Sequence, residues 1–424
     1  MKKLGARTWC TLLLAGLVGQ FAWTIENMYF NVILYNTIST DPQYIAAMVA
    51  ASAITATVTT LVMGGVSDRI GRRKPFIAFG YILWGLSTMA FGWITPERLG
   101  AWFPAANAAA AAAVAVVVLD CVMTFFGSTA NDAAFNAYIT DVTDASNRGR
   151  AESVLAVLPL LSMLIIFGAF DGMTKAGRWQ QFFSIFGGLV TLTGIAAFFL
   201  VQDSAVQKAD AQHFSNLLYG FRPSVIRSHG MLYLALTSLC LFSVAVQVFF
   251  PYLIIYMQTY LGLSNYAIVL GIVLLTASLV SVLSGKLLDR IGRLRCILPA
   301  GAVLLAGLVG MYFARDFGSV IAAGCVMMSG YMLVTAILSA AIRDYTPSGQ
   351  VGHFQGIRMI FAVLLPMVTG PYLGAAVIAN SSQTYEELGA IKNVPTPAIF
   401  LAAAAVLLLA IVPICALRKK AHAC

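Results

Sequence analysis

The chain has 424 residues, of which 60% are hydrophobic and only 10% charged, and its mean hydropathy is +0.85. A soluble domain is about a quarter charged and about half apolar, so this composition excludes an ordinary soluble protein. Apolar residues form long uninterrupted runs instead of the alternation that is typical of membrane β-barrels. We therefore expect an all-α integral membrane protein.

The first element is an apolar run that follows Lys2, Lys3 and Arg7 and continues to about Ile38. It is longer than the roughly 7–15-residue apolar core of a signal peptide, and we interpret it as the first membrane helix. Eleven further runs have lengths near the ~20 residues that a helix needs to cross the hydrocarbon core. The twelve expected helices cover residues 9–37, 43–65, 76–95, 108–138, 152–172, 180–201, 231–257, 266–287, 296–314, 319–342, 356–379 and 397–417.

The widest polar gap, residues 202–229, falls between the sixth and seventh expected helices. It predicts an N-terminal six-helix bundle over 1–201, a cytoplasmic central loop over 202–229 and a C-terminal six-helix bundle over 230–424. With the N-terminus inside, 21 of the 26 Lys and Arg residues fall on the cytoplasmic side, which favours cytoplasmic termini in a bacterial inner (plasma) membrane. The net charge of +9 is explained by this topology, without a nucleic-acid partner.

The two halves of the chain repeat a charged pattern. Five residues of the first half recur at a constant offset of 221, and the pairs are Gly64 and Gly285, Asp68 and Asp289, Arg69 and Arg290, Gly71 and Gly292, Arg72 and Arg293. A second set recurs at an offset of 203, with the pairs Asp141 and Asp344, Gly149 and Gly352, Glu152 and Gln355. These echoes indicate an internal duplication.

The pattern G-x-x-x-D-R-x-G-R-R at 64–73 resembles the signature loop of the major facilitator superfamily, and DVTDASNRGRA at 141–151 is similar to its turn after helix four. With twelve spans and a central loop, the resemblance covers essentially the whole chain. It implies two pseudo-symmetric six-helix bundles, a transporter instead of an enzyme, and a central path lined by helices one, four, seven and ten.

Within that superfamily the chain looks most like the carbohydrate transporters, the glycoside–pentoside–hexuronide cation symporters and the sucrose-type proton symporters. The likeness lies in SDRIGRRKPF at 67–76 and in an acidic residue of helix four. Melibiose-permease-like members carry acidic cation ligands in helix two, and residues 43–65 contain none. A proton is therefore the expected coupling ion and sodium is less favoured.

The repeated charged loops suggest a cytoplasmic latch. Gly64 and Gly71 would allow a tight turn and close packing, and Asp68 would face a helix N-terminus. Arg69 and Arg72 would pair with carboxylates such as Asp141. Topology anchoring alone explains the basic residues but not the fixed glycines and aspartates. The expected latch residues are Gly64, Asp68, Arg69, Gly71, Arg72, Asp141, Arg148, Gly285, Asp289, Arg290, Gly292, Arg293 and Asp344.

Three carboxyl groups stand inside expected spans, where an ionisable residue is costly and marks a functional site by default. They are Glu26 in helix one and Asp120 and Asp132 in helix four. Two neighbouring carboxyls in a low dielectric favour one of them holding a proton, which predicts a proton-coupling site without a metal. Each could instead form a structural hydrogen bond, and Asp132 could neutralise a nearby arginine.

Polar and aromatic residues of helices one, four and seven are the candidate substrate contacts. At 100° per residue Trp23, Asn27 and Asn31 share one side of helix one, with Glu26 at the edge of that arc. The full set is Trp23, Asn27, Asn31, Asn131, Gln247, Tyr252 and Tyr256. The tyrosines could instead face lipid, and Arg358 could be either a topology anchor or an anion clamp.

The sequence thus predicts a monomeric transporter that imports a small polar solute, with carbohydrates favoured, by proton symport through alternating access. No nucleotide loop, zinc spacing or nucleophile elbow occurs, and the seven cysteines form no CxxC pair, so we expect neither an enzyme nor a cofactor. A proton-coupled drug or metabolite exporter is the alternative. Residues 154–170 lack the exporter element G-P-x-x-G-G, but Gly370-Pro371-Tyr372-Leu373-Gly374 resembles it. A sensor that transports nothing is a third candidate, and the short central loop argues against it.

Overall fold

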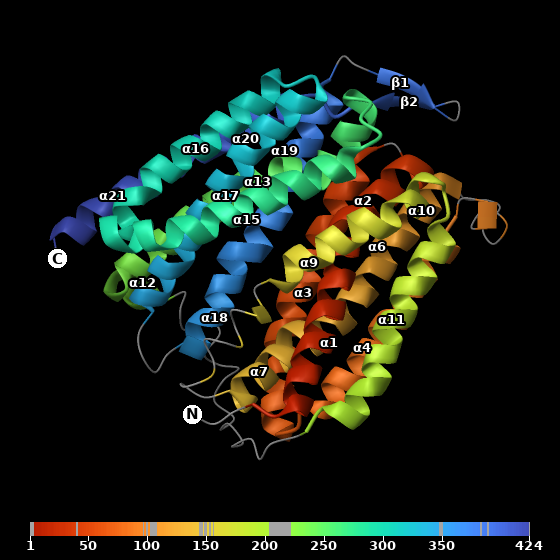
Figure 1. Ribbon diagram of the computed structural model, residues 1–424, viewed down its shortest axis with the longest axis horizontal. Helices are drawn as coiled ribbons and strands as arrows, with labels where there is room; N and C mark the ends of the chain where they lie inside the picture. The colour runs from red at the N-terminus through yellow and green to blue at the C-terminus, as the bar shows by residue number, and fades with distance from the viewer. Residues whose placement is uncertain are drawn as a thin grey trace. The chain divides into compact units, whose positions relative to one another are not determined.

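A computed structural model describes residues 4–39, 41–95, 97–98, 101, 108–143, 147, 151, 154–155, 157–202, 222–346, 351–381, 384–387 and 390–423. In this part of the chain twelve helices are long and apolar enough to cross a membrane, the first over Ala6–Ile38 and the last over Ala398–Ala421. The predicted number and order of membrane helices are confirmed (Figure 1).

The chain divides into two compact units, one of Met1–Thr40 with Ala51–Phe214 and the other of Asp41–Ala50 with Ser215–Cys424. The predicted central loop at 202–229 falls mostly on residues 203–221, which lie outside the described part. The predicted bundle boundaries therefore stay a prediction.

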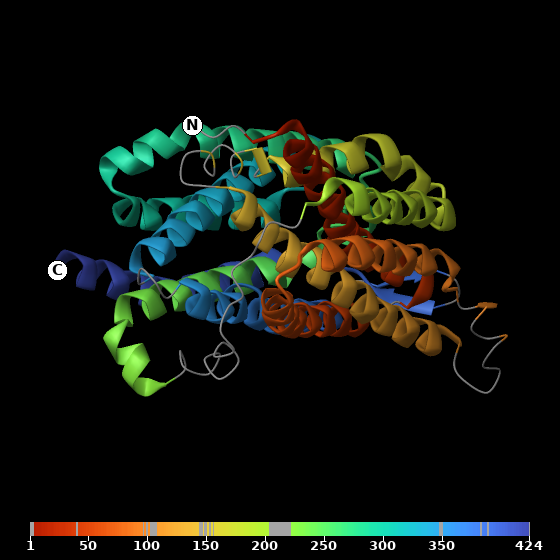
Figure 2. The same ribbon diagram turned by 90° about the horizontal axis from the view of Figure 1, so that it is seen from below.

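The first unit contains spans one to six, except residues 42–50 at the start of span two, and its helices run alongside one another (Figures 1 and 2, red to yellow-green). The most extensive helix contact in its described part is between α4 (Lys74–Ala90) and α11 (Trp179–Leu200). The elements are α1 (Ala6–Thr24), η1 (Ile25–Tyr29), α2 (Phe30–Ile33), η2 (Leu34–Ile38), α3 (Pro42–Ile70), α4 (Lys74–Ala90), η3 (Phe91–Trp93), α6 (Ala108–Gly127), η4 (Ser128–Phe135), α7 (Asn136–Val142), α9 (Leu158–Ile165), η5 (Ile166–Phe170), α10 (Asp171–Lys175) and α11 (Trp179–Leu200).

The second unit contains spans seven to twelve. Its elements are α12 (Pro223–Ser228), α13 (Gly230–Phe249), η8 (Phe250–Tyr252), α14 (Leu253–Ile255), η9 (Tyr256–Tyr260), α15 (Tyr266–Ile291), α16 (Arg293–Phe313), α17 (Phe317–Tyr345), α18 (Val351–Met359), η10 (Ile360–Leu364), α19 (Leu365–Ala379), α20 (Ala398–Leu409) and α21 (Ile411–Ala423). A short antiparallel hairpin, β1 (Thr384–Glu387) and β2 (Ala390–Asn393), connects α19 to α20. It adds one small extramembrane element to the expected all-α fold.

Several spans contain π-helical segments. In the first unit they are η1 and η2 of span one, η4 of span four and η5 of span five, and in the second unit η9 and η10 of spans seven and eleven. The i→i+5 bonding of such a segment turns each residue through less than the 100° of an α-helix. Side chains beyond the segment therefore point in directions that a uniform 3.6-residue period does not predict.

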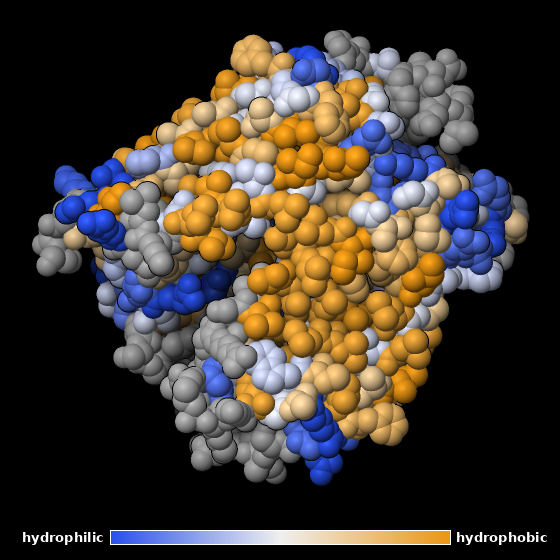
Figure 3. Space-filling model, viewed as in Figure 1, coloured by the Kyte–Doolittle hydropathy of each residue, from blue (hydrophilic) through white to orange (hydrophobic). Residues whose placement is uncertain are grey.

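The outer face of the first unit is apolar, as a lipid-facing surface requires. Figure 3 shows a wide hydrophobic area over these helices. Residues such as Leu192 and Phe199 of α11 are 63% and 73% exposed, and Val157 beside α9 is 56% exposed. In water such a surface would cause the protein to aggregate, whereas in a membrane the lipid acyl chains cover it.

The duplication extends to the backbone of the charged loops. Gly71 follows the last residue of α3 and has φ of 70°, and its counterpart Gly292 follows α15 with φ of 99°. Both are in the left-handed region, which glycine adopts without a Cβ penalty. The expected tight turn at Gly71 is therefore present, and its amide donates to Ser67 O at 3.0 Å. Gly64, in contrast, lies inside α3, and a Cβ built there meets no described atom within 4 Å.

We expect Gly71→Ala to destabilise the protein by about 1–2 kcal/mol, because an alanine at this positive φ meets the following carbonyl oxygen. Gly64→Ala is the matched control and should stabilise by about 0.5–1 kcal/mol, since it lowers the entropy of the unfolded chain. Thermal unfolding in detergent measures both. A Gly71→Ala midpoint at or above that of the wild type would contradict the assigned backbone geometry.

Candidate functional site

A hydroxyl–carboxyl cluster lies inside the first unit, where spans one, two and four meet. Glu26, in the π-helical segment η1, is 8% exposed. Its Oε1 accepts hydrogen bonds from Ser52 of α3 at 2.6 Å and from Thr124 of α6 at 3.1 Å, and the two hydroxyls are 2.9 Å apart. The three oxygens therefore form a closed triangle from three different spans.

Asp120 belongs to the same cluster. It lies one helical turn before Thr124 on α6 and is 1% exposed, and its carboxyl group faces both Ser52 and Glu26. Among the described residues, Glu26 Oε2 and Asp120 Oδ1 have no hydrogen-bond partner. A buried carboxyl oxygen without a partner costs several kcal/mol if the group is charged, so the pair is suited to hold a proton. The structure thus brings together two of the three predicted carboxyls.

Asp132 lies further along span four, in the π-helical segment η4. Ser128 donates to its Oδ2 at 3.0 Å, and the residue is only partly buried. Asp120, Thr124, Ser128 and Asp132 follow one another at intervals of four residues. The smaller rotation per residue in η4 limits the drift of this polar row around the helix. No hydrogen bond between Thr124 and Ser128 is present in the described structure, so Asp132 lies at the end of the row without a direct link to the pair.

The predicted substrate contact Asn131 has both ends of its amide occupied. Its Oδ1 accepts from the indole of Trp23 at 3.3 Å, and its Nδ2 donates to the Tyr81 hydroxyl at 2.7 Å. Tyr81 in turn donates to Ala15 O at 2.7 Å. The Trp23 ring lies 4.9 Å from that of Trp84. Asn131 therefore orients Trp23. Of these linked residues, Trp23 is the one that stays partly exposed.

Two asparagines of span one hydrogen-bond to their own helix. Asn27 Nδ2 donates to Trp23 O at 2.8 Å, and Asn31 Nδ2 donates to Asn27 O at 2.9 Å. Both amides thus donate to backbone carbonyls four residues earlier in span one. Asn31 is buried and its Oδ1 has no partner among the described residues, whereas Asn27 is partly exposed.

In the second unit, two of the three predicted substrate contacts are fully buried. Tyr252 donates from its hydroxyl to Pro371 O at 2.9 Å, and its ring lies against Gly374, where a Cβ would come within 2.7 Å. This geometry assigns Tyr252 to the packing of span seven on span eleven. Gly370 approaches Gln247 in the same way, so the Gly370–Gly374 element allows close contact of α19 with α13.

Tyr256 is also 0% exposed, which gives it no free face for a solute in this structure. Its ring is stacked on Tyr260 with centroids 5.3 Å apart and meets Phe400 edge-on at 5.2 Å. Its hydroxyl is buried and has no partner among the described atoms. Gln247 is partly buried.

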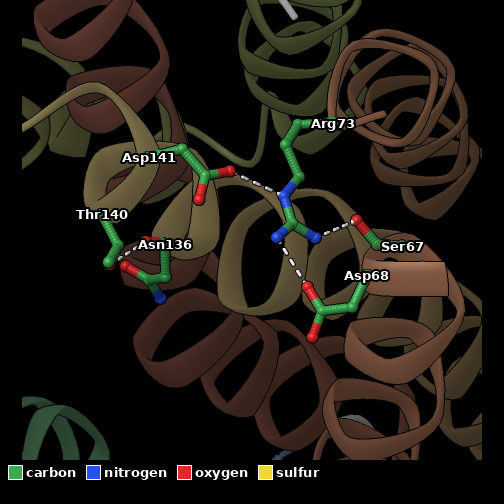
Figure 4. Close-up of polar contacts among 6 residues, drawn as sticks. All are labelled: Ser67, Asp68, Arg73, Asn136, Thr140 and Asp141. Atoms are coloured by element: carbon green, nitrogen blue, oxygen red, sulfur yellow. Dashed lines mark hydrogen bonds and ion pairs between the residues drawn. The ribbon is translucent and has the colours of Figure 1, made fainter. Parts of the chain in front are cut away.

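The charged loop of the first unit is organised by Arg73 (Figure 4). The guanidinium group contacts Asp68 at 2.6 Å and Asp141 at 2.9 Å and donates to Ser67 Oγ at 2.7 Å. Burial opposes the charge of Arg73, but the bonds to Asp141 and Asp68 outweigh it, so its pKa lies above the ordinary value. One buried arginine therefore joins the end of α3 to the end of α7 and the start of α4.

The expected pairing of Arg69 and Arg72 with Asp141 was wrong. Both arginines are exposed, and neither forms an ion pair in the part of the chain that the structure describes. The reversal of the chain at Gly71 turns Arg73 inward, whereas Arg72 points outward. Sequence reasoning missed Arg73 because it is absent from the repeat: at the offset of 221 its counterpart is Leu294, and that of Ser67 is Leu288.

The remaining latch residues fall into two groups. Arg290 and Asp344 are exposed. Arg148 and the side-chain surroundings of Gly285, Asp289 and Arg293 lie outside the described part of the structure. Because the counterparts of Ser67 and Arg73 are leucines, the second half cannot repeat the same set of contacts. The two loops thus share a backbone turn but not the arginine-centred cluster.

The sequence matches the model of the Major Facilitator Superfamily over residues 12–331 and again over 266–423. Together these matches cover nearly the whole chain. The chain belongs to the Major Facilitator Superfamily, and it is a multi-pass membrane transporter and not an enzyme.

Solved transporters share the fold at low sequence identity. A mutant of the nucleoside transporter NupG superposes with a TM-score of 0.74 at 11% identity, over 96% of this chain and 98% of that chain. A D-xylose-proton symporter superposes with a TM-score of 0.71 at 15% identity, over 96% of this chain and 97% of that chain. A bacterial homologue of the human lysosomal transporter Spinster superposes with a TM-score of 0.65 at 13% identity, over 100% of this chain and 96% of that chain. These likenesses establish the fold.

One curated relative matches locally. The multidrug transporter AQR1 of Candida glabrata is 31% identical over 106 residues, which are 25% of this chain and 18% of that protein. The chain thus spans less than a fifth of the length of this relative.

Proposed function

We propose that the protein is a secondary active transporter that imports a small polar solute of the carbohydrate class together with protons. The observation that carries this proposal is the buried pair of Glu26 and Asp120, which come from spans one and four and are linked to hydroxyls. A buried carboxyl pair can take up and release a proton without a metal.

Two partly exposed side chains near this pair along span one support a polar solute with apolar faces. Trp23 is partly exposed and held in orientation by Asn131, and Asn27 is partly exposed on the following turn of span one. An aromatic ring stacks on the apolar face of a sugar, and amide groups hydrogen-bond to hydroxyls. The structural likeness to a D-xylose-proton symporter agrees with this substrate class.

The proposed setting is a bacterial inner membrane, with both termini in the cytoplasm and the monomer as the working unit. The basic residues support this orientation, because 21 of 26 would lie on the cytoplasmic side. On this assignment the Arg73 cluster lies at the cytoplasmic end of the first unit, where it would act as a latch that opens during transport.

Uptake of labelled solutes into proteoliposomes tests the function. With an imposed gradient of one pH unit, acid outside, one-proton symport supports about tenfold accumulation, since one unit is worth 1.36 kcal/mol. We expect at least one compound from a panel of sugars, sugar acids and amino acids to accumulate, with sugars first. Equal levels of every compound with and without the gradient would contradict symport.

Export by proton antiport is a second candidate, favoured by the local match to a multidrug transporter and by the Gly370–Gly374 element. In the structure, however, this element packs α19 against α13 and thus has a structural role in the described state. Drug sensitivity of cells that lack their own pumps separates the two functions: an exporter lowers sensitivity, whereas a sugar symporter leaves it unchanged.

A further inference from the structure

Ser52 of α3 occupies the centre of the carboxyl cluster, although nothing in the sequence distinguishes it from other serines of apolar helices. It is 3% exposed. Its Oγ lies 2.6 Å from Glu26 Oε1, which is shorter than the usual O–H···O distance of about 2.7–2.8 Å and within the range of bonds to a carboxylate. It also contacts Thr124 Oγ1 at 2.9 Å and faces Asp120.

The number of protons in this cluster limits the hydrogen bonds that can exist together. Glu26 Oε1, Ser52 Oγ and Thr124 Oγ1 form a triangle with edges of 2.6, 2.9 and 3.1 Å. The hydroxyls of Ser52 and Thr124 supply only two protons. The triangle has three contacts, and Ser52 also faces Asp120. A third proton, carried by one of the two carboxyls, satisfies these contacts better than two charged carboxylates do.

We propose that the Ser52 hydroxyl passes the coupling proton between Glu26 and Asp120. This inference rests on the proposed proton coupling and names the residue that connects its two carboxyls. When the proton is on Glu26, the carboxyl donates to Ser52 Oγ and Ser52 donates to Asp120. When the proton is on Asp120, the directions reverse and Ser52 donates to Glu26.

The transfer is balanced and needs no other reactant. Glu26 O–H breaks as Ser52 Oγ accepts that proton, while Ser52 O–H breaks as the proton moves to Asp120, and the serine ends neutral. The carboxyl oxygens Glu26 Oε2 and Asp120 Oδ1 are buried and have no hydrogen-bond partner among the described atoms, so either can carry the proton. Ser52 comes from a different span from either carboxyl, so movement of α3 can make or break the link.

Other groups around the pair cannot replace Ser52. Thr124 donates to the same Glu26 oxygen, but it lies on the same helix as Asp120, one turn later, and no bond between the two side chains is present in the described structure. Asp132 forms its hydrogen bond with Ser128, and no bond from Asp132 to Glu26 or Asp120 is present in the described structure. Ser52 is the hydroxyl that faces both.

The first test compares Ser52→Ala, Ser52→Thr and Thr124→Val in proteoliposomes. With a gradient of one pH unit, we expect Ser52→Ala to lower accumulation from about tenfold to near the equilibrium level, and to leave solute exchange at equal pH unchanged within about twofold. Ser52→Thr keeps the hydroxyl and should restore accumulation, and Thr124→Val, which removes one donor to Glu26 but leaves the Ser52 link, should lower accumulation less than Ser52→Ala does. Wild-type accumulation by Ser52→Ala, or equal loss in Ser52→Thr and Ser52→Ala, would overturn the relay.

A second measurement does not depend on transport. Infrared absorption of protonated carboxyls, followed against pH in the solute-free protein, should lose intensity in both Glu26→Gln and Asp120→Asn. Ser52→Ala should shift the titration midpoint by about one pH unit, because it uncouples the two groups. A wild type without accumulation refutes the proposed function, whereas an unchanged titration in Ser52→Ala refutes the relay alone.

Discussion

We expect replacing Glu26 by Gln, or Asp120 by Asn, to abolish solute accumulation driven by a pH gradient while exchange of solute across the membrane continues. Each substitution keeps the size of the side chain and removes the group that can bind and release a proton. Both residues are nine-tenths or more buried in one hydroxyl-linked cluster. With a gradient of one pH unit, accumulation should fall from about tenfold to the equilibrium level.

Glu97→Gln is the control for this experiment, because Glu97 is an exposed carboxyl outside the membrane spans. It should accumulate solute as the wild type does. Exchange measured at equal pH on both sides shows that each variant is folded and can bind solute. Tenfold accumulation by both Glu26→Gln and Asp120→Asn would remove the coupling role of the pair.

Replacing Arg73 by Ala should destabilise the protein by roughly 1–3 kcal/mol. Removing one partner of a fully buried ion pair costs about 3–5 kcal/mol. Here the Arg73 side chain is 6% exposed, but Asp68 and Asp141 are 36% and 20% exposed, so water screens part of the loss. Arg73→Lys should recover less than half of the lost stability, because an ammonium group lacks the planar fork with which a guanidinium group bonds to both carboxylates.

Arg72→Ala and Arg69→Ala serve as matched controls one and four residues away. Both side chains are exposed, so each substitution should change stability by less than about 0.5 kcal/mol. Thermal unfolding in detergent compares the four variants. An Arg73→Ala midpoint equal to that of Arg72→Ala would show that the arginine-centred cluster does not hold α3, α4 and α7 together.

The fold could be predicted because the sequence patterns that indicate it extend over many residues. Twelve apolar runs, each near the length of a span, and the charge asymmetry between loops do not depend on the position of any single side chain. The expected turn is present at Gly71, which has a φ of 70°, but not at Gly64, which lies inside α3. The β1–β2 hairpin was missed, because it lies in a short polar loop without strong alternation.

The site was predictable only where a residue is unusual for its surroundings. A carboxyl in an apolar helix is such a residue, so Glu26 and Asp120 were found. Ser52 was missed because a single serine in an apolar helix carries no signal. The angular argument for helix one assumed 100° per residue, which the π-helical segment η1 does not follow, and of the residues expected on one side Trp23 and Asn27 are partly exposed whereas Asn31 is buried.

Arg73 was missed for a different reason. The repeat drew attention to Arg69 and Arg72, which recur in the second half, whereas Arg73 has Leu294 as its counterpart. Which of three neighbouring arginines turns inward depends on the backbone reversal at Gly71 and the start of α4, not on their spacing. A repeat shows where a motif is, but the contacts of its side chains depend on local geometry.

Solute-driven proton movement is the most direct test of the central claim that a buried carboxyl pair couples protons to solute. Proteoliposomes would carry a pH-sensitive dye outside, with no imposed gradient, and receive sugars one at a time. We predict external alkalinisation on adding the transported sugar, absent in Asp120→Asn. Uptake of that sugar without any pH change in the wild type, or the same change in Asp120→Asn, would contradict the account.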